Sequence, residues 1–193
     1  KTAYEMANDC YGTMRVVAKD KSVLERIFKI MQNEDKEFTL AKNRGTTQMT
    51  PITQNGEFFS CDMDVDGAWD CSEFLYHDDD PKKLECISQI YVPEKNGYEY
   101  KYGTAHYTNL PHLAKTLGFG CEAFTTEPGC GFCEHWAVDH NGNFNYDEGA
   151  YSLEYPEGEN GEPDYDAEPK EEIGLDNFME FNEAGDIWVN PNF

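Results

Sequence analysis

The chain has 193 residues and a formal net charge of −23, from 38 Asp and Glu against 15 Lys and Arg. Aromatic residues make up 14% of it, which supplies enough apolar surface for a buried core, so the acidity does not indicate a disordered chain. A polyanion is repelled by nucleic-acid phosphates and attracted by basic proteins. The composition therefore argues against direct DNA or RNA binding and favours a folded domain with a basic partner.

Membrane insertion is not expected from the sequence. No stretch approaches the ~20 consecutive apolar residues of a membrane span, and the first residues lack the basic-then-apolar layout of a secretory signal. We therefore expect a cytoplasmic protein.

The first half of the chain predicts a strand, a helix and a hairpin. Residues 11–18 are strand-like, and Ser22 with Glu25 forms a capping box that begins an amphipathic helix. Residues 57–76 contain two alternating runs on either side of Asp66-Gly67, which is a strong signal for a β-hairpin. In that hairpin Cys61 and Cys71 would point to opposite faces.

The second half predicts a helix and further strands. The helix covers residues 108–119, is capped by Asn109 and ends at Gly118. Strands are expected over residues 121–127 and 131–138, on either side of Pro128-Gly129, and over residues 144–153, after the turn signal Asn141-Gly142.

This order of elements is an α+β pattern. It fits a ferredoxin-like sandwich over residues 7–153, with an antiparallel sheet, two helices on one face and an added β-hairpin. Residues 154–193 form an acidic C-terminal extension, rich in Pro and Gly over 155–169. Because apolar residues follow 172, we expect the extension to dock on the body.

Three stretches resemble a known family. They are residues 7–14 (ANDCYGTM), the helix at 110–118, and residues 127–132 followed by Glu134 and His135. In these the chain is similar to the YubB-like family of phage and plasmid proteins, which has a ferredoxin-like domain. The resemblance implies a mobile-element origin and, since the family has no established chemistry, no catalytic residue.

Seven cysteines cannot all pair, so thiols or metal ligands are expected in place of a disulfide framework. Cys130, Cys133 and His135 have the spacing of zinc ligands, and Cys71 or Cys10 could complete a structural site. Alternatively, the cysteines are small buried side chains. A redox Cys-x-x-Cys is less favoured because a strand, not a helix, is expected after it.

Residues 62–73 also match the twelve-residue calcium-loop template. The strand-like sequence before them argues against an EF-hand. We expect instead the hairpin with an anionic outer face, on which calcium could bind weakly.

The usual markers of nucleophile elbows, phosphate loops and zinc proteases are absent from the sequence, so we do not expect an enzyme.

The charge and the resemblance together suggest an anti-CRISPR-like inhibitor that blocks a basic nucleic-acid-handling effector of a bacterial host, such as a CRISPR nuclease. The carboxylates expected to contact that partner are Asp62, Asp64, Asp66, Asp78, Asp79, Asp80, Asp164 and Asp166. Three alternatives remain: a zinc-dependent enzyme or redox protein using Cys130, Cys133 and His135, an accessory protein without a host target, and a charged face that only confers solubility.

Overall fold

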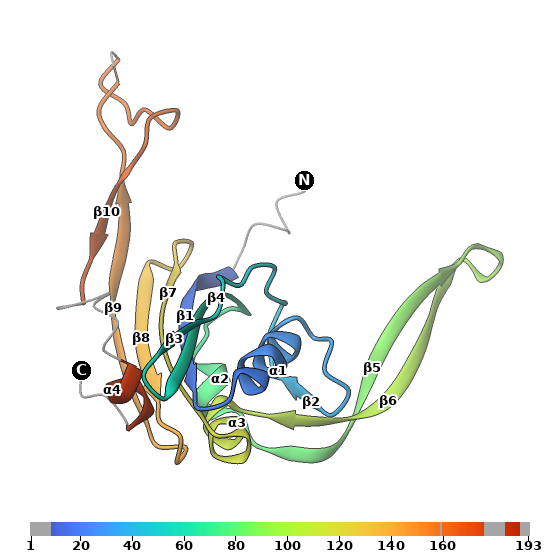
Figure 1. The fold of residues 1–193 in the computed structure, drawn as a ribbon. Coiled ribbons are helices and arrows are strands. Elements are labelled where there is room, and N and C mark those ends of the chain that lie inside the picture. Colours follow the sequence, from blue (N-terminus) through green and yellow to red (C-terminus); the bar gives the residue numbers. More distant parts are fainter. Residues whose placement is uncertain (1–8, 159, 176–183, 190–193) are drawn as a thin grey trace.

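The computed structural model describes residues 9–158, 160–175 and 184–189, with the backbone alone described for 81–91 and 98–105. Ten strands, four α-helices and a 3₁₀ turn are assigned in these residues (Figure 1). In chain order they are β1 (Asp9–Ala18), α1 (Lys21–Met31), β2 (Phe38–Leu40), β3 (Thr53–Asn55), β4 (Phe58–Ala68), α2 (Glu73–Tyr76), β5 (Asp80–Val92), η2 (Pro93–Lys95), β6 (Gly97–Thr108), α3 (Leu110–Leu117), β7 (Phe119–Glu127), β8 (Phe132–Val138), β9 (Phe144–Glu154), β10 (Lys170–Ile173) and α4 (Ala184–Trp188).

The main architecture is a seven-stranded sheet in the order β10-β9-β8-β7-β1-β4-β3, which curls into a half-barrel (Figure 1). All its strand pairs are antiparallel. Helices α1 and α3 pack on one face, here called the helix face, where their leucines and isoleucines meet Met14, Met63 and Trp136 in the main core. Because successive side chains along a strand point to opposite faces, every second residue of these strands lies on the other side of the sheet, here called the outer face.

Helices α1 and α3 confirm the two helices expected from the sequence. In α1 the buried residues Leu24, Ile27 and Met31 follow helical spacing, but the N-cap is Asp20, whose carboxylate accepts from Ser22 N at 2.8 Å. The prediction that Ser22 and Glu25 form a capping box at the start of this helix was therefore wrong, because the N-cap lies two residues earlier. No helix in the described residues is long and apolar enough to cross a membrane.

The ferredoxin-like sandwich expected from the sequence is wrong. That fold is a β-α-β-β-α-β unit, a four-stranded sheet with two helices on one face. Here the antiparallel sheet has seven strands and curls into a half-barrel, because the meander β7-β8-β9-β10 extends it on one side of β1, and β4 and β3 extend it on the other. The local pattern of strands and helices was read correctly in places, but it did not specify which strands pair.

The hairpin expected at Asp66-Gly67 is also wrong. Strand β4 runs straight through both residues, with Asp66 opposite Tyr11 and Gly67 opposite Cys10. An alternating pattern fits one long strand as well as two short ones, so only the pairing with β1 decides. Gly67 serves close packing there, since a Cβ would lie 3.0 Å from Cys71 Sγ.

Two projections leave the half-barrel in different directions (Figure 1). One is a long ribbon of β5 and β6, and β2 joins β6 in parallel to make a second, three-stranded sheet. The other is formed by the end of β9, the loop after it, and β10. The sequence analysis predicted neither the ribbon nor β10.

Candidate acidic interaction surface

The projection of β9 and β10 carries a dense group of carboxylates. We call residues 151–173, without residue 159, the acidic arm. Lys170 is the only basic residue in this stretch. Every described acidic residue of the arm is exposed. These are Glu154, Glu157, Glu162, Asp164, Asp166, Glu168, Glu171 and Glu172.

The base of the arm is fixed to the sheet by a small apolar cluster on the outer face. Tyr151 packs with Phe124 and Cys133 there, and Leu153 and Leu175 lie against them. The Tyr151 hydroxyl donates to a Glu171 carboxylate oxygen at 2.8 Å. Burial and the neighbouring carboxylate raise the pKa of Tyr151, so the phenol stays a protonated donor.

The loop beyond β9 folds on itself through backbone hydrogen bonds. Gly158 N donates to Glu162 O at 2.8 Å, and Asp164 N donates to Pro156 O at 2.8 Å. The rings of Tyr155 and Tyr165 lie 5.0 Å apart across the loop. These contacts give the loop a defined shape that holds its carboxylates outward.

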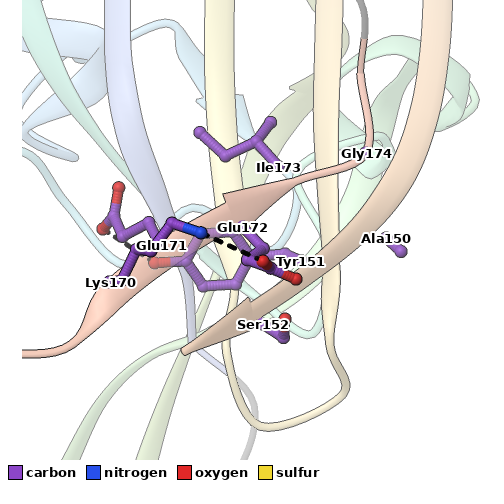
Figure 2. A pocket seen from close by; sticks show the side chains of 8 residues that line it. All are labelled: Ala150, Tyr151, Ser152, Lys170, Glu171, Glu172, Ile173 and Gly174. Atoms are coloured by element: carbon purple, nitrogen blue, oxygen red, sulfur yellow. Dashed lines mark hydrogen bonds and ion pairs between the residues drawn. The ribbon is translucent and has the colours of Figure 1, made fainter. Parts of the chain in front are cut away.

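An open pocket of about 440 Å³ lies on the arm where β9 and β10 run side by side (Figure 2). Its wall contains the side chains of Tyr151, Glu171, Glu172 and Ile173. Lys170 Nζ lies 3.3 Å from Glu172 Oε1 at this place, drawn as a dashed line in Figure 2. The pocket thus already accommodates an ammonium group beside a carboxylate, which is the chemistry that a lysine or arginine of a partner would offer.

Among the residues that the structure describes, strand β10 is the last strand of the seven-stranded sheet, and its four side chains are exposed. An edge strand presents unpaired backbone groups to other chains. Charged residues on such a strand discourage indiscriminate pairing, and β10 reads Lys-Glu-Glu-Ile. The arm therefore offers both carboxylates and a sheet edge.

The carboxylates predicted for partner binding do not form one surface. Asp62, Asp64 and Asp66 project from the outer face of β4, far along the sheet from the arm. Asp62 accepts two hydrogen bonds from Arg15, at 2.7 and 3.0 Å, so its charge is neutralised within the chain. Burial and the charge of Asp9 raise the pKa of Asp66.

Asp78, Asp79 and Asp80 lie at the base of the β5–β6 ribbon. Burial is the largest single influence on the pKa of Asp79 and raises it, but the hydrogen bond with His106 and the other opposing interactions, among them the charge of His112, together outweigh burial, so the pKa is lowered. Of the predicted set, Asp164 and Asp166 belong to the arm. The glutamates beside them in the loop were not named individually as partner-binding residues, although they lie in the acidic C-terminal stretch over 155–169 described from the sequence.

The match to the calcium-loop template does not form a helix–loop–helix unit. Residues 62–68 belong to β4, and α2 begins only at Glu73, so no loop between two helices is formed. Asp70, a liganding position of the template, instead accepts hydrogen bonds from Ser72 and from Glu73 N.

The four predicted zinc ligands are not brought together. Cys130 is exposed in the turn between β7 and β8, while Cys133 is buried and donates its thiol toward Gly149 O at 3.5 Å. His135 Nε2 lies 2.8 Å from Glu122 Oε1, and Glu122 is 2% exposed. Cys133 and His135 lie on the outer face of the sheet. Cys71 lies on the helix face, so the sheet separates it from Cys133 and His135.

Cys71 instead belongs to a buried network around Glu134, which the sequence analysis did not single out as a site. In the described part of the chain Glu134 accepts hydrogen bonds from five donors: Cys10 Sγ, Cys71 N, Ser72 N, Thr125 Oγ1 and Tyr146 OH. Burial is the main cause that raises the pKa of Glu134, with the hydrogen bonds opposing it.

Cys10, Cys71 and Glu134 are close enough to hold a metal ion. Both thiol hydrogens are already used, however, since Cys71 Sγ donates to Cys10 O at 3.3 Å and Cys10 Sγ donates to Glu134. Burial raises the pKa of the Cys71 thiol, which disfavours the thiolate that zinc requires. We interpret the network as a structural anchor that ties α2 to the sheet.

Comparison of the chain with protein-family models, curated proteins and solved structures found no match. The similarity to the YubB-like family therefore stays a prediction. The mobile-element origin and the anti-CRISPR role that depended on it gain no support from these comparisons.

Proposed function

We propose that this protein is a non-catalytic binding protein whose acidic arm docks on a basic, nucleic-acid-handling surface of a partner protein. The observation that carries the proposal is the exposure of eight described carboxylates on one projection with a single lysine. Like charges held this close repel one another, and a basic partner relieves that repulsion on binding.

A surface that handles nucleic acids is the favoured partner because it already presents lysine and arginine side chains to a line of negative charges. The arm offers a comparable line along its loop and β10. The exposed Tyr165, 74% accessible, adds an aromatic side chain of the kind enriched at interface centres. We place this interaction in the cytoplasm, where thiols such as those of this cysteine-containing chain stay reduced.

The first test compares two charge variants of the full chain. The arm variant carries Asp164→Asn, Asp166→Asn and Glu168→Gln, which remove three exposed charges from the loop. The control variant carries Glu34→Gln, Glu57→Gln and Glu94→Gln, which remove three exposed charges elsewhere. Both have the same net charge, so they differ only in where the charge is lost.

Each variant is used to capture proteins from a bacterial lysate at low salt, and the dissociation constant of a captured partner is then measured. We expect the arm variant to bind at least about tenfold more weakly than the wild type, and the control to stay within about twofold. Wild-type affinity should fall steeply between about 50 mM and about 500 mM salt because exposed charges are screened.

Competition with duplex DNA tests the class of partner. DNA should displace the arm if both occupy the same basic surface, and the order of addition should not matter. Equal losses in the two variants, affinity that does not change with salt, or a partner that binds DNA and this protein simultaneously would each contradict the proposal.

A further inference from the structure

A second group of polar side chains meets where the β5–β6 ribbon joins the body. His106 Nε2 lies 2.7 Å from Asp79 Oδ1, and His112 Nδ1 lies 3.9 Å from Asp79 Oδ2. The candidate ligand atoms of all three residues lie within 4.8 Å of one another. They come from three different elements: the segment before β5, the end of β6 and the first turn of α3.

The backbone around this group is fixed by Asn109. Its side-chain oxygen accepts from His112 N at 2.7 Å, which caps α3, and its amide donates to His77 O at 2.7 Å. One side chain thus holds the segment before β5 against the turn that carries His112. On the other side, the ring of Phe38 lies 4.9 Å from the ring of His106.

Two imidazoles and one carboxylate are a ligand set typical of divalent transition metals. Zinc binds histidine nitrogen and carboxylate oxygen at about 2.0–2.2 Å, so tetrahedral ligand atoms lie about 3.4 Å apart. The distance from His106 Nε2 to Asp79 Oδ1, 2.7 Å, is shorter than that value, and the distance from His112 Nδ1 to Asp79 Oδ2, 3.9 Å, is longer. Small side-chain rotations would therefore complete the geometry. Calcium and magnesium prefer oxygen ligands alone, and the two histidines make this a poor site for them.

We propose that Asp79, His106 and His112 form a binding site for a divalent transition metal of the zinc class. A simple hydrogen bond between His106 and Asp79 explains that pair, but not the orientation of His112 Nδ1 toward the same carboxylate. All three side chains are partly exposed, so water can fill the remaining coordination positions. The site is separate from the acidic arm and from the Cys130, Cys133 and His135 set.

Isothermal titration of the metal-free full chain with Zn²⁺ tests the proposal. We expect about one equivalent to bind, and His106→Gln, His112→Gln and Asp79→Asn each to weaken binding at least about tenfold. His112 is on the surface, so His112→Gln should fold normally, and circular dichroism checks this for every variant. The arm variant described above should bind zinc as well as the wild type, which separates this site from the proposed function.

Two control variants identify the ligands. His77→Gln removes a nearby histidine that faces Glu73, with Nδ1 3.7 Å from Glu73 Oε2. Cys130→Ser removes the exposed thiol of the set expected from the sequence. Both should bind zinc within about twofold of the wild type.

Cobalt provides a spectroscopic readout that does not depend on affinity. Co²⁺ bound to nitrogen and oxygen ligands should give visible bands without the thiolate charge-transfer band in the near ultraviolet. The proposal is overturned if the wild type binds no zinc, if the three ligand variants bind as well as the wild type, if Cys130→Ser abolishes binding, or if the thiolate band appears.

Discussion

The hydroxyl of Tyr151 on β9 donates a 2.8 Å hydrogen bond to Glu171 on β10, and so joins the two strands at the base of the acidic arm. β10 has four residues and, in the described part of the chain, pairs only with β9. The side-chain bond therefore adds to a short backbone ladder.

The variant Tyr151→Phe keeps the ring in its apolar cluster and removes only this bond. We expect a loss of about 0.5–1.5 kcal/mol in local stability, as for a typical hydrogen bond. Hydrogen exchange followed by mass spectrometry should show faster exchange in β10 with little change in β1 or β7. Unchanged exchange in β10 would show that the bond does not hold the strand.

The buried carboxylate of Glu134 gives a prediction for pH. Its pKa is raised in the folded state, so the folded chain binds this proton more tightly than the unfolded chain does. The stability that it contributes is complete below the ordinary glutamate pKa and is lost as pH rises through the raised value. Glu134→Gln cannot titrate, so its stability relative to the wild type should improve over that pH range.

Urea denaturation of both proteins at a series of pH values measures this difference. We expect the difference in unfolding free energy between the two proteins to change over that pH range, because Glu134 titrates and the glutamine amide does not. A difference between the two proteins that stays constant with pH would contradict the raised pKa.

Asn109 is expected to stabilise the fold through two separate bonds. Asn109→Ala loses the cap of α3 and the bond to His77 O, at a cost of about 1–2 kcal/mol. Asn109→Ser keeps a capping oxygen and loses the bond to His77 O, so it should cost about half as much. Thermal denaturation of the two variants measures the difference, and equal costs would show that the cap contributes nothing and that the bond to His77 O alone matters.

Gly120 marks the close approach of α4 to the outer face of the sheet. A Cβ at this position would lie 2.5 Å from Ile187 O, which is too close without movement of the backbone. Gly120→Ala should therefore displace α4 and expose Trp188, which stacks on His140 with ring centroids 4.4 Å apart. Faster hydrogen exchange in residues 185–189 is the expected readout.

The matched control is Gly97→Ala at the start of β6, where the nearest atom to an added Cβ is Lys95 O at 3.7 Å. That is an ordinary contact, so exchange in residues 185–189 should not change. The two variants should therefore differ clearly. Equal exchange in both would show that α4 does not depend on the space at Gly120.

The sequence predicted the elements whose signals are local. Helix α3 is capped by Asn109 at its start and by Gly118 at its end, as expected. Gly118 has the left-handed φ of 75° that ends a helix. The strands around Pro128-Gly129 and after Asn141-Gly142 also formed as β7, β8 and β9. In each case the turn or cap residue acts on its own neighbours, so its effect can be read without knowing the fold.

The partners of each strand and the members of each site depended on the tertiary structure. Asp66-Gly67 became part of a straight strand because β1 pairs along its full length, which a local turn signal does not reveal. Cys130, Cys133 and His135 are neighbours in sequence, but Cys130 is exposed in a turn, and Cys133 and His135, although on one face, contact Gly149 O and Glu122 respectively. Asp79 and His106 are 27 residues apart and meet because the β5–β6 ribbon returns to its own base.

The sequence by itself determined the strong negative charge, the position of two helices and the acidity of the C-terminal third. Only the tertiary structure decided that part of this charge lies on a projecting arm while Asp62 is neutralised by Arg15. The physical reason is that composition and local propensity act over a few residues, whereas a charge becomes a binding group or a structural one according to what the folded chain places beside it.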